Sequence, residues 1–555
     1  MKIIMQYKFL VLILVLAAIL RLWGLGGNPP HLSNDEASLG YNAYSILKTA
    51  RDEHGEFLPI IFQSFGDWKP GLYIYLDVPF IAILGLTEFA VRLPAALSGI
   101  IAVLLVYLLV SRLFNNQRLG VASAFFLTIS PWHLQFSRGA WEAGVAFTFV
   151  LAGIYFFLRA INGKPKVLVV SAIIFALTLW TYQGAKLSTG IVVAGLILFF
   201  GKELFKLPKK IIGWSALLGF LVAFPILLSL TQGKAGRLEV YSIFSYERSP
   251  ETIQEIIGQE GITQSSPIYF LYHSESLNFF RGILGRWANH YSARFFFFEG
   301  DWNITRHSVP NNGLLLLLDA VFLIAGFVAL ARKGASQSAL FIWFLLLFSP
   351  LPAALSRDSV HAIRSLSMVI PVSCLLGFWF LFLWDKKREW GRLAKPVLVI
   401  FSLFYLANYI YYLDAYWVHA PKRNSQDWQY GYKQMAQKLA LLKDTYKEIV
   451  VKQDFAQPYI FFLFYWKYDP AKYQATVKNV FAPSEFKDVG LVSRLDNITF
   501  REINWSADRG MTGKLFIVDS IKVPIEDSSD PREFKLIDEI KYLNGQSAFR
   551  FLEIQ

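Results

Sequence analysis

Residues 90–113 read AVRLPAALSGIIAVLLVYLLVSRL, and a run of this kind is typical of a helix that crosses a membrane. Its two charged residues, Arg92 and Arg112, lie near its ends, and its length suits the ~30 Å apolar core of a bilayer. Comparable runs occur at about residues 9–25, 119–136, 142–161, 166–182, 188–205, 210–230, 313–331, 338–355, 362–384 and 393–414. The first of them has no small-x-small cleavage site before Arg21, so we expect an uncleaved transmembrane helix rather than a signal peptide.

The composition points to the same class of protein. The 555 residues are 54% hydrophobic and only 17% charged, whereas soluble domains contain about 25% charged residues. These values exclude a disordered chain, an ordinary soluble enzyme and a collagen-like scaffold. The net charge of +13 is more typical of cytoplasmic loops of a membrane protein than of a nucleic-acid site, so no nucleic-acid partner is expected. The single cysteine, Cys374, excludes intramolecular disulfides and CxxC zinc sites.

The positions of Lys and Arg predict how the helices are oriented. The basic clusters are Arg112/Arg118, Arg159/Lys164/Lys166, Lys202/Lys206/Lys209/Lys210, Arg332/Lys333 and Lys386/Lys387/Arg388/Arg392. With eleven spans and a cytoplasmic N-terminus, all of these clusters face the cytoplasm. Counting 71–86 as a further span would place them on the wrong side, so we interpret it as a helix lying at, or re-entering, the outer face. The long segments 26–89, 231–312 and 415–555 are then extracytoplasmic.

The end of the chain differs from the rest. A helical pattern at about 425–443 precedes two strand-like runs, KEIVVKQD at 447–454 and KLFIVDS at 514–520. Roughly 140 residues are enough for a core of their own. The predicted fold class is therefore a polytopic α-helical membrane protein of about eleven transmembrane helices, with its membrane domain over 1–415 and an extracytoplasmic soluble α/β domain over 416–555.

Two adjacent carboxylates, Asp35 and Glu36, follow the first apolar run. One interpretation is structural, because Ser33, Asn34 or Asp35 can cap a helix over residues 36–48, where acidic residues are favoured in the first turn. The other interpretation is a general base or a metal ligand beside the membrane. The sequence alone leaves both open.

Several cations lie where spans are expected to reach the outer face. Lys69 precedes a proline in Phe65-Gly-Asp-Trp-Lys-Pro, and such a lysine can present a fixed charge to a phosphate. Arg92 stands in Arg-Leu-Pro at the start of the second span, where an arginine can also simply snorkel to the interface. Arg138 is four residues before Glu142, so a helix would allow a salt bridge as the alternative to phosphate binding.

Two further pairs suit an anion. Tyr182 and Lys186 end the fifth span with a phenol and an ammonium group. His361 and Arg364 are three residues apart, which would place them on one face of a helix at the start of the tenth span. Because cationic groups just inside a membrane helix are rare, we favour phosphate binding for this pair.

The second long loop carries acidic and basic residues after four consecutive phenylalanines. These are Asp301, Arg306 and His307, and we expect either a lid over a lipid or acceptor groove or an ordinary aromatic belt anchor. Asp35, Glu36, Asp301 and His307 would form an oxygen-rich metal site only if the loops converge. No HExxH motif occurs, and we expect no required metal or other cofactor, although a divalent cation would be compatible.

The order of these elements resembles that of the GT-C membrane glycosyltransferases. The resemblance rests on an Asp-Glu pair after the first helix, a Lys-Pro-Gly-Leu element and an Arg-Leu-Pro-Ala element opening the next span, and it covers roughly residues 8–415. The chain is most similar to family 39, the group of protein O-mannosyltransferases and aminoarabinose transferases. It differs from the aminoarabinose transferases, which have Lys-Pro-Pro, and it has no segment resembling the MIR domain.

The resemblance implies an activity and roles for specific residues. It implies transfer of one sugar, with inversion, from a polyprenyl-phosphate lipid to an acceptor outside the cytoplasm, either a protein hydroxyl or an envelope glycolipid or glycan. Asp35 matches the aspartate that takes the proton from the acceptor, Glu36 would orient it, and Lys69 and Arg92 match the two cationic positions. The implied location is the plasma membrane of a bacterium or archaeon.

Two other classes of protein fit parts of the sequence. A transporter or lipid flippase would explain the many spans, but its charged residues are more often near the membrane midplane. A non-catalytic scaffold would explain the C-terminal segment but not Asp35, Glu36 and Arg92.

Overall fold

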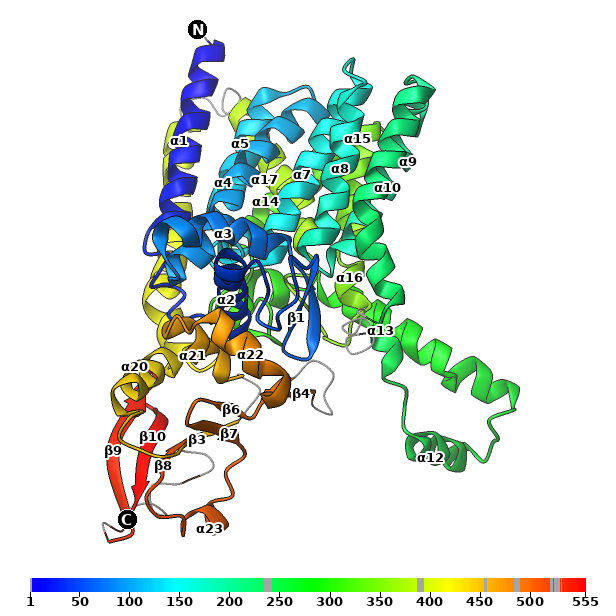
Figure 1. Ribbon diagram of the computed structural model, residues 1–555. Helices are drawn as coiled ribbons and strands as arrows, with labels where there is room; N and C mark the ends of the chain where they lie inside the picture. Colours follow the sequence, from blue (N-terminus) through cyan, green and yellow to red (C-terminus); the bar gives the residue numbers. More distant parts are fainter. Residues whose placement is uncertain are drawn as a thin grey trace.

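The protein is a helical bundle with an added layer at one end. The computed structural model describes residues 2–233, 242–386, 394–453, 457–483, 490–519, 523, 530 and 532–555. Figure 1 shows that the loop after the first helix and the C-terminal segment together cover one end of the bundle, here called the sheet end. The N-terminus lies at the opposite end.

A helix lies at each of the expected spans. They are α1 (Lys2–Leu22), α4 (Glu88–Leu113), α5 (Gln117–Ile129), α7 (Glu142–Ile161), α8 (Val167–Thr181), α9 (Ala185–Leu204), α10 (Lys209–Thr231), α14 (Asp319–Ala331), α15 (Gln337–Phe348), α17 (Val369–Lys386) and α18 (Ala394–Asp414). Apolar side chains from several of them form the core of the bundle, among them Leu127, Phe147, Leu345 and Ile370. The chain is an integral membrane protein.

Not every helix is as long as its apolar run. Seven helical segments of the described residues are long and apolar enough to cross a membrane by length and composition. Helices α5, α8 and α14 have only 13 to 15 residues, about 20 Å at 1.5 Å per residue. In α5 the cause is local, because Pro131 lacks an N–H and starts a separate helix, α6 (Pro131–Gln135), capped by Ser130.

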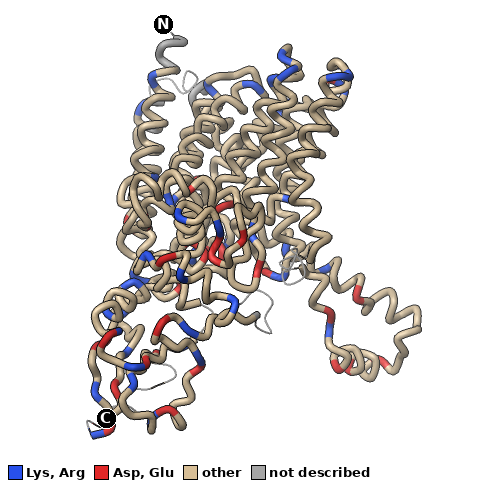
Figure 2. The backbone as a smooth tube through the Cα atoms, in the orientation of Figure 1, with Lys and Arg blue, Asp and Glu red and all other residues tan. Residues whose placement is uncertain are grey.

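Charge is distributed unevenly between the two ends. Figure 2 shows Lys and Arg at the helix ends far from the sheet, whereas the sheet end carries Asp and Glu together with Lys and Arg. Of the basic cluster predicted at 386–392, residues 387–392 lie outside the described residues.

The first loop builds the part of the sheet end nearest the bundle. It contains α2 (Asn34–Thr49) and an antiparallel hairpin of β1 (Ile61–Ser64) and β2 (Asp67–Pro70), in which Phe62 is opposite Lys69. Helix α3 (Leu72–Leu84) follows and runs across the end of the bundle rather than along it (Figure 1).

The loop between α10 and α14 projects sideways. Its helices include α12 (Pro250–Glu260) and α13 (Glu275–Asn289), which extend away from the bundle in Figure 1. After α15 come the short α16 (Leu351–Ala354) and a 3-10 turn at Leu366–Met368 that leads into α17.

The C-terminal segment forms a mixed six-stranded sheet in the order β6-β7-β3-β8-β10-β9. Strand β3 is parallel to β7 and β8, and the other pairs are antiparallel. The strands are β3 (Ile449–Lys452), β6 (Arg494–Leu495), β7 (Ile498–Arg501), β8 (Leu515–Val518), β9 (Phe534–Lys541) and β10 (Ser547–Ile554), with β4 (Phe481–Pro483) and β5 (Gly490–Val492) paired separately. The helices are α19 (Ala420–Arg423), α20 (Tyr432–Leu442), α21 (Tyr459–Tyr465), α22 (Pro470–Val480) and α23 (Trp505–Asp508).

The C-terminal segment shares a hydrophobic core with the first loop. One continuous cluster contains Tyr41 and Phe62 from the loop together with Val451 and Phe461 from the C-terminal segment. At Gly40 a Cβ atom would lie 2.5 Å from Val91 and 2.7 Å from Phe464, so α2, α4 and α21 pack without space for a side chain. The segment after residue 415 is therefore packed tightly against the loop that carries Asp35.

Candidate active site

Helix α2 begins in a way that separates its two carboxylates. Ser33 Oγ accepts a hydrogen bond from the N–H of Glu36 (3.3 Å), and Glu36 Oε2 accepts one from the N–H of Ser33 (2.9 Å). Glu36 is thus part of a capping box. Asp35, one residue earlier, has a side chain that is 36% exposed and forms an ion pair with Lys69, whose side chain is only 4% exposed.

Glu36 is held by Arg92 at the centre of a buried network. Arg92 Nε donates to Glu36 Oε1 (2.9 Å) and Nη2 donates to Oε2 (3.2 Å), while the N–H of Ala140 also donates to Oε1 (2.8 Å). The other N–H groups of Arg92 donate to the backbone carbonyls of Leu25 (3.1 Å), Pro29 (2.9 Å) and His31 (2.6 Å). All five donors of this guanidinium group have protein acceptors. The geometry thus supports a structural role for Arg92.

Arg138 is also fully buried, and its hydrogen bonds connect segments that are far apart in the chain. It donates to the hydroxyl of Tyr416 (2.9 Å) and to the carbonyls of Leu20 (2.8 Å) and Asn28 (2.9 Å). The predicted helical i,i+4 relationship with Glu142 does not exist, because α7 begins only at Glu142 and turns precede it.

The hairpin that carries Lys69 contacts the connection between α8 and α9. Gln183 Nε2 donates to the carbonyl of Trp68 (2.7 Å), and Lys186 Nζ in turn donates to Gln183 Oε1. Asp67 also attracts the Lys186 ammonium group electrostatically. The structure therefore brings the hairpin of Lys69 and the start of α9 with Lys186 into one polar region, as a shared phosphate site would need.

A narrow crevice lies between α7, the start of α9 and the segment before α17. Its volume is about 20 Å³, and its polar lining includes Tyr182, Ser188 and Arg364 among apolar residues of α7. Arg364 forms an ion pair with Asp358 (3.0 Å).

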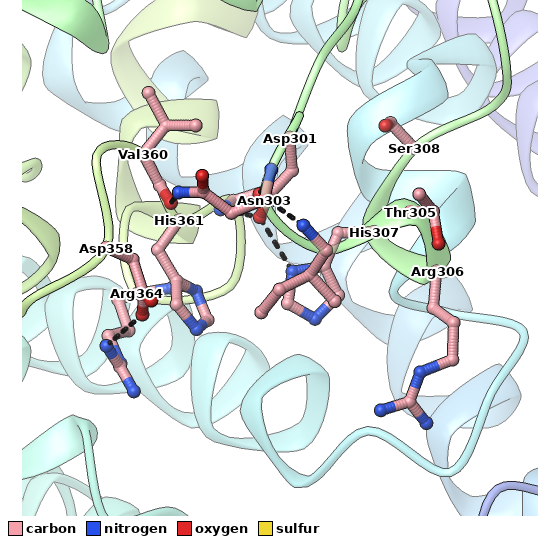
Figure 3. Close-up of polar contacts among 12 residues, drawn as sticks. Asp301, Asn303, Thr305, Arg306, His307, Ser308, Asp358, Val360, His361 and Arg364 are labelled. Atoms are coloured by element: carbon pink, nitrogen blue, oxygen red, sulfur yellow. Dashed lines mark hydrogen bonds and ion pairs between the residues drawn. The ribbon is translucent and has the colours of Figure 1, made fainter. Parts of the chain in front are cut away.

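Asp301, His307 and His361 come together from two loops (Figure 3). His307 Nδ1 is 2.7 Å from Asp301 Oδ2, and the two imidazole rings are 5.1 Å apart between centroids. Burial lowers the pKa of His307, although the Asp301 carboxylate opposes this shift. The prediction that His361 and Arg364 share a helical face is wrong, because α17 begins only at Val369 and residues 362–365 form turns.

The four residues considered from the sequence for an oxygen-rich metal site do not come together in the structure. Among the described residues, the group able to hold a metal contains Asp301 and His307 with His361, and neither Asp35 nor Glu36. The reason is that Glu36 is already held by Arg92.

Residues of the C-terminal segment cover this region, and sequence reasoning missed them. Trp428 lies beside Arg306, whose guanidinium carbon is 5.9 Å from the Trp428 ring and 6.0 Å from that of Trp141. Gln429 Oε1 accepts a hydrogen bond from the N–H of Asn34 at the start of α2 (2.6 Å). No local signal marks these residues, because their partners are more than a hundred positions away in the chain.

A buried acid in the first loop was also missed. Glu53 is fully buried, and its Oε1 accepts a hydrogen bond from Asn42 Nδ2 (3.1 Å). Burial raises the pKa of Glu53 to about 8, and the nearby charge of Lys69 opposes this shift.

The comparisons with known proteins agree with this architecture. Residues 69–228 match the family model described as dolichyl-phosphate-mannose-protein mannosyltransferase. The structure is similar to that of ArnT from Cupriavidus metallidurans in the apo state, with a TM-score of 0.53 and 11% identity over 98% of each chain. The same protein bound to undecaprenyl phosphate gives a TM-score of 0.52 and 11% identity, over 99% of this chain and 98% of that one. The apo Archaeoglobus fulgidus oligosaccharyltransferase gives 0.50 and 14% identity, over 93% of this chain and 69% of that one. No curated protein matches the sequence.

The chain has the fold of the GT-C membrane glycosyltransferases, and its residues 69–228 match the model of a family of such enzymes. Within that superfamily, the sequence similarity to the mannosyltransferase family is carried by residues 69–228, which include Lys69, Arg92, Arg138 and Lys186. The resemblance predicted from the order of motifs is confirmed, and the transporter considered as the alternative is not supported.

Proposed function

We propose that this glycosyltransferase moves a single sugar from a polyprenyl-phosphate carrier to a hydroxyl group of an acceptor outside the cytoplasm, with inversion. The observation that carries the proposal is the ion pair between Asp35 and Lys69, in which a partly exposed carboxylate meets a buried ammonium group. The fold shared with ArnT, which binds undecaprenyl phosphate, supports a lipid-linked donor. The basic helix ends opposite the sheet support a cytoplasmic N-terminus (Figure 2).

Asp35 and Lys69 fit the two charges that such a reaction must manage. The acceptor oxygen attacks C1 of the sugar and loses its proton to the Asp35 carboxylate. The bond between C1 and the phosphate oxygen breaks, and its electron pair leaves with the polyprenyl phosphate. Lys69, with Lys186 at the start of α9, would neutralise the negative charge that develops on this leaving group. Attack opposite the leaving group inverts the anomeric carbon.

The donor lipid would approach from the bundle. The crevice is lined by Tyr182 and Arg364 and, from α7, by Ala146, Phe147 and Val150. Tyr182, His361 and Arg364 would thus lie on the donor side. A thin apolar crevice suits the start of a polyprenyl chain, and the side chains of α7 and α9 would widen it when the lipid enters.

The acceptor would approach from the sheet end. A cavity of about 750 Å³ lies beside the hairpin and is lined by Trp68, Gln63 and Glu56, together with Gln232 and Lys478. This volume is in the range of sites for small molecules, and aromatic and amide groups suit a sugar or peptide hydroxyl. Glu142, Arg306 and His307, with Asp301 supporting His307, would shape the other border of the acceptor path.

A transfer assay tests the proposal. Purified full-length protein and its Asp35→Asn variant would be given a panel of polyprenyl-phosphate monosaccharides with a cell-envelope extract, and release of polyprenyl phosphate would be measured. We expect Asp35→Asn to lower release by about 100-fold or more, because it removes the base. Asp414→Asn, an exposed carboxylate of α18, is the matched control and should not change it.

Two results would contradict the proposal. Equal release by wild type and Asp35→Asn would remove Asp35 from the reaction. Failure of the wild type to release polyprenyl phosphate from any donor of the panel would exclude this class of donor.

A further inference from the structure

The arm formed by residues 244–289, between α10 and α14, has no core of its own. The structure describes every residue of this arm, and none of their side chains is buried. Large apolar side chains are nevertheless exposed along it, among them Phe270 (71%), Tyr272 (65%) and Phe280 (62%). Leaving such side chains in water costs free energy, and contiguous exposed apolar patches mark contacts with another protein or with a membrane. The arm therefore needs a surface that covers these side chains.

Helix α13 in this arm carries an apolar stripe. Phe280, Leu284 and Trp287 follow one another at spacings of four and three residues, and Leu277 precedes Phe280 by three. At 3.6 residues per turn these four side chains lie along one side of the helix, whereas Asn278 lies on the opposite side. Helices with this division into an apolar and a polar side lie on membrane surfaces or on grooves of other proteins.

One end of the stripe is attached to a membrane helix. Trp287 Nε1 donates a hydrogen bond to the carbonyl of Leu347 (2.7 Å), in the last turn of α15. The hydroxyl of Tyr291, just after α13, donates to the carbonyl of Leu346 (2.7 Å). The side chains of Leu347 and Phe348 are exposed at this end of α15, where a spanning helix faces lipid. The apolar stripe of α13 therefore continues the lipid-facing surface of the bundle.

The direction of α13 suits the surface of a bilayer. Figure 1 shows that α13 leaves the bundle beside α16 and extends sideways, across the direction of the membrane helices. This direction runs along the membrane surface at the sheet end. Helix α12 lies farther from the membrane helices than α13 does (Figures 1 and 2), and it carries the acidic residues Glu251, Glu255 and Glu260. The acidic helix is thus on the side away from the bilayer, as the cost of placing carboxylates in an apolar layer requires.

We propose that α13 and residues 268–272 lie on the bilayer leaflet at the sheet end, with the apolar stripe of α13 facing the lipid. The apolar face of such a helix typically enters the boundary between headgroups and acyl chains by about 5–10 Å. A second copy of the chain, or a soluble partner, would also cover apolar side chains. Neither explains why the stripe ends at the lipid-facing end of α15. The proposal does not depend on the transfer reaction.

Contact with the leaflet would act on a segment near the proposed donor path. His290 follows α13, and its Nε2 accepts a hydrogen bond from the N–H of His361 (3.1 Å). Asn289 Nδ2 donates to the carbonyl of Ser359 (3.3 Å) in the same segment. An arm held on the leaflet would therefore hold residues 359–361, next to Arg364, at a fixed height above the lipid.

The test measures how close the stripe is to lipid. Cys374 is the single cysteine of the chain and is buried, so a cysteine introduced on the arm can be labelled selectively in the folded protein. Phe280→Cys and Leu284→Cys would each place a polarity-sensitive fluorophore on the stripe. Gln254→Cys, at an exposed position of α12, is the matched control. Wild type treated in the same way gives the background from Cys374.

The labelled full-length proteins would be reconstituted in phosphatidylcholine nanodiscs. Quenching by lipids with a nitroxide group on the acyl chain would be compared with quenching by iodide in the water. We expect nitroxide lipids to quench the dyes at 280 and 284 at least about threefold more than the dye at 254, because the stripe enters the interface. Iodide should show the reverse order. Substitutions at exposed positions rarely disturb folding, and size-exclusion chromatography would confirm that each variant is monodisperse.

Two outcomes would overturn the proposal. If iodide reaches the dyes at 280 and 284 as freely as the dye at 254, and nitroxide lipids quench none of them, the stripe is in water. If the dyes at 280 and 284 are shielded from both quenchers, the stripe packs against protein. An increase in particle size with protein concentration would then identify that protein as a second copy of the chain.

Discussion

Asp35 and Glu36 are neighbours in sequence but contact different partners. Successive side chains of a helix point in different directions. Glu36 therefore points inward to Arg92, whereas Asp35 lies at the surface of α2 and faces Lys69. The structural interpretation is confirmed for Glu36, which belongs to a helix cap, whereas the interpretation of Asp35 as a general base stays a prediction. Glu53, another acid of the first loop, is fully buried, and the charge of Lys69 acts on it.

The buried Glu53 predicts a dependence of stability on pH. The folded protein keeps a proton on this group up to about pH 8, whereas an unfolded chain loses it near 4.5. Between these values the unfolded state binds fewer protons, so stability falls as pH rises, by at most about 1.4 kcal/mol per pH unit. The Glu53→Gln variant lacks this loss of stability with rising pH. Its apparent Tm, compared with that of the wild type, should therefore increase steadily from about pH 5 to about pH 8.

The measurement is thermal unfolding in detergent across that pH range. Glu255→Gln, at an exposed position of α12, serves as the control and should follow the wild type at every pH. A Glu53→Gln protein with the same pH dependence as the wild type would show that Glu53 is ionised in the folded state.

At the scale of elements, the position of α2 depends on α4. Arg92 near the start of α4 bonds to the Glu36 side chain in the first turn of α2 and to three carbonyls of the chain between α1 and α2. Proline and hydrogen-bonding patterns also decide where helices stop, as at Pro131, which divides the expected span 119–136. The end of α2 that carries Asp35 is thus held in place by Arg92.

The change Arg92→Lys tests this role. A lysine keeps the charge but has three donors in place of five in a planar fork, so buried acceptors lose their partners. We expect a lower apparent Tm and a loss of about 2 kcal/mol or more, while Arg332→Lys at an exposed position should have little effect. An unchanged Tm combined with a raised KM for the lipid donor would instead support direct phosphate binding by Arg92.

At the scale of the whole molecule, the C-terminal segment completes the region around Asp35. Its helix α21 packs on α2 at Gly40, and Gln429 accepts a hydrogen bond from the first residue of α2. The proposed boundary at residue 416 therefore marks a change of composition, but the packing there is continuous.

Removal of this segment should therefore destabilise the first loop. A chain ending at residue 415 would expose the apolar face of α2, and we expect aggregation or a lower apparent Tm by size-exclusion chromatography and thermal unfolding. Phe464→Ala, which leaves the chain whole, should cost about 3–5 kcal/mol, whereas Phe280→Ala at an exposed position should not. A truncated protein that is monodisperse and as stable as the full chain would show that the two parts are independent.

Local patterns were sufficient to locate the membrane helices, the capped helix with Asp35 and the strands at 449–452 and 515–518. They were sufficient because apolar runs, caps and alternating residues act over a few positions of the chain. The order of short motifs also indicated the superfamily.

Contacts between distant residues settled the rest. Through such contacts the donors of Arg92 and Arg138 bond to acceptors within the protein. Through them, too, His361 lies beside His307 and Asp301 and does not share a helical face with Arg364. They also placed Trp428 beside Arg306. Each of these outcomes depends on packing between segments that are more than fifty residues apart, and for such packing the sequence has no local signal.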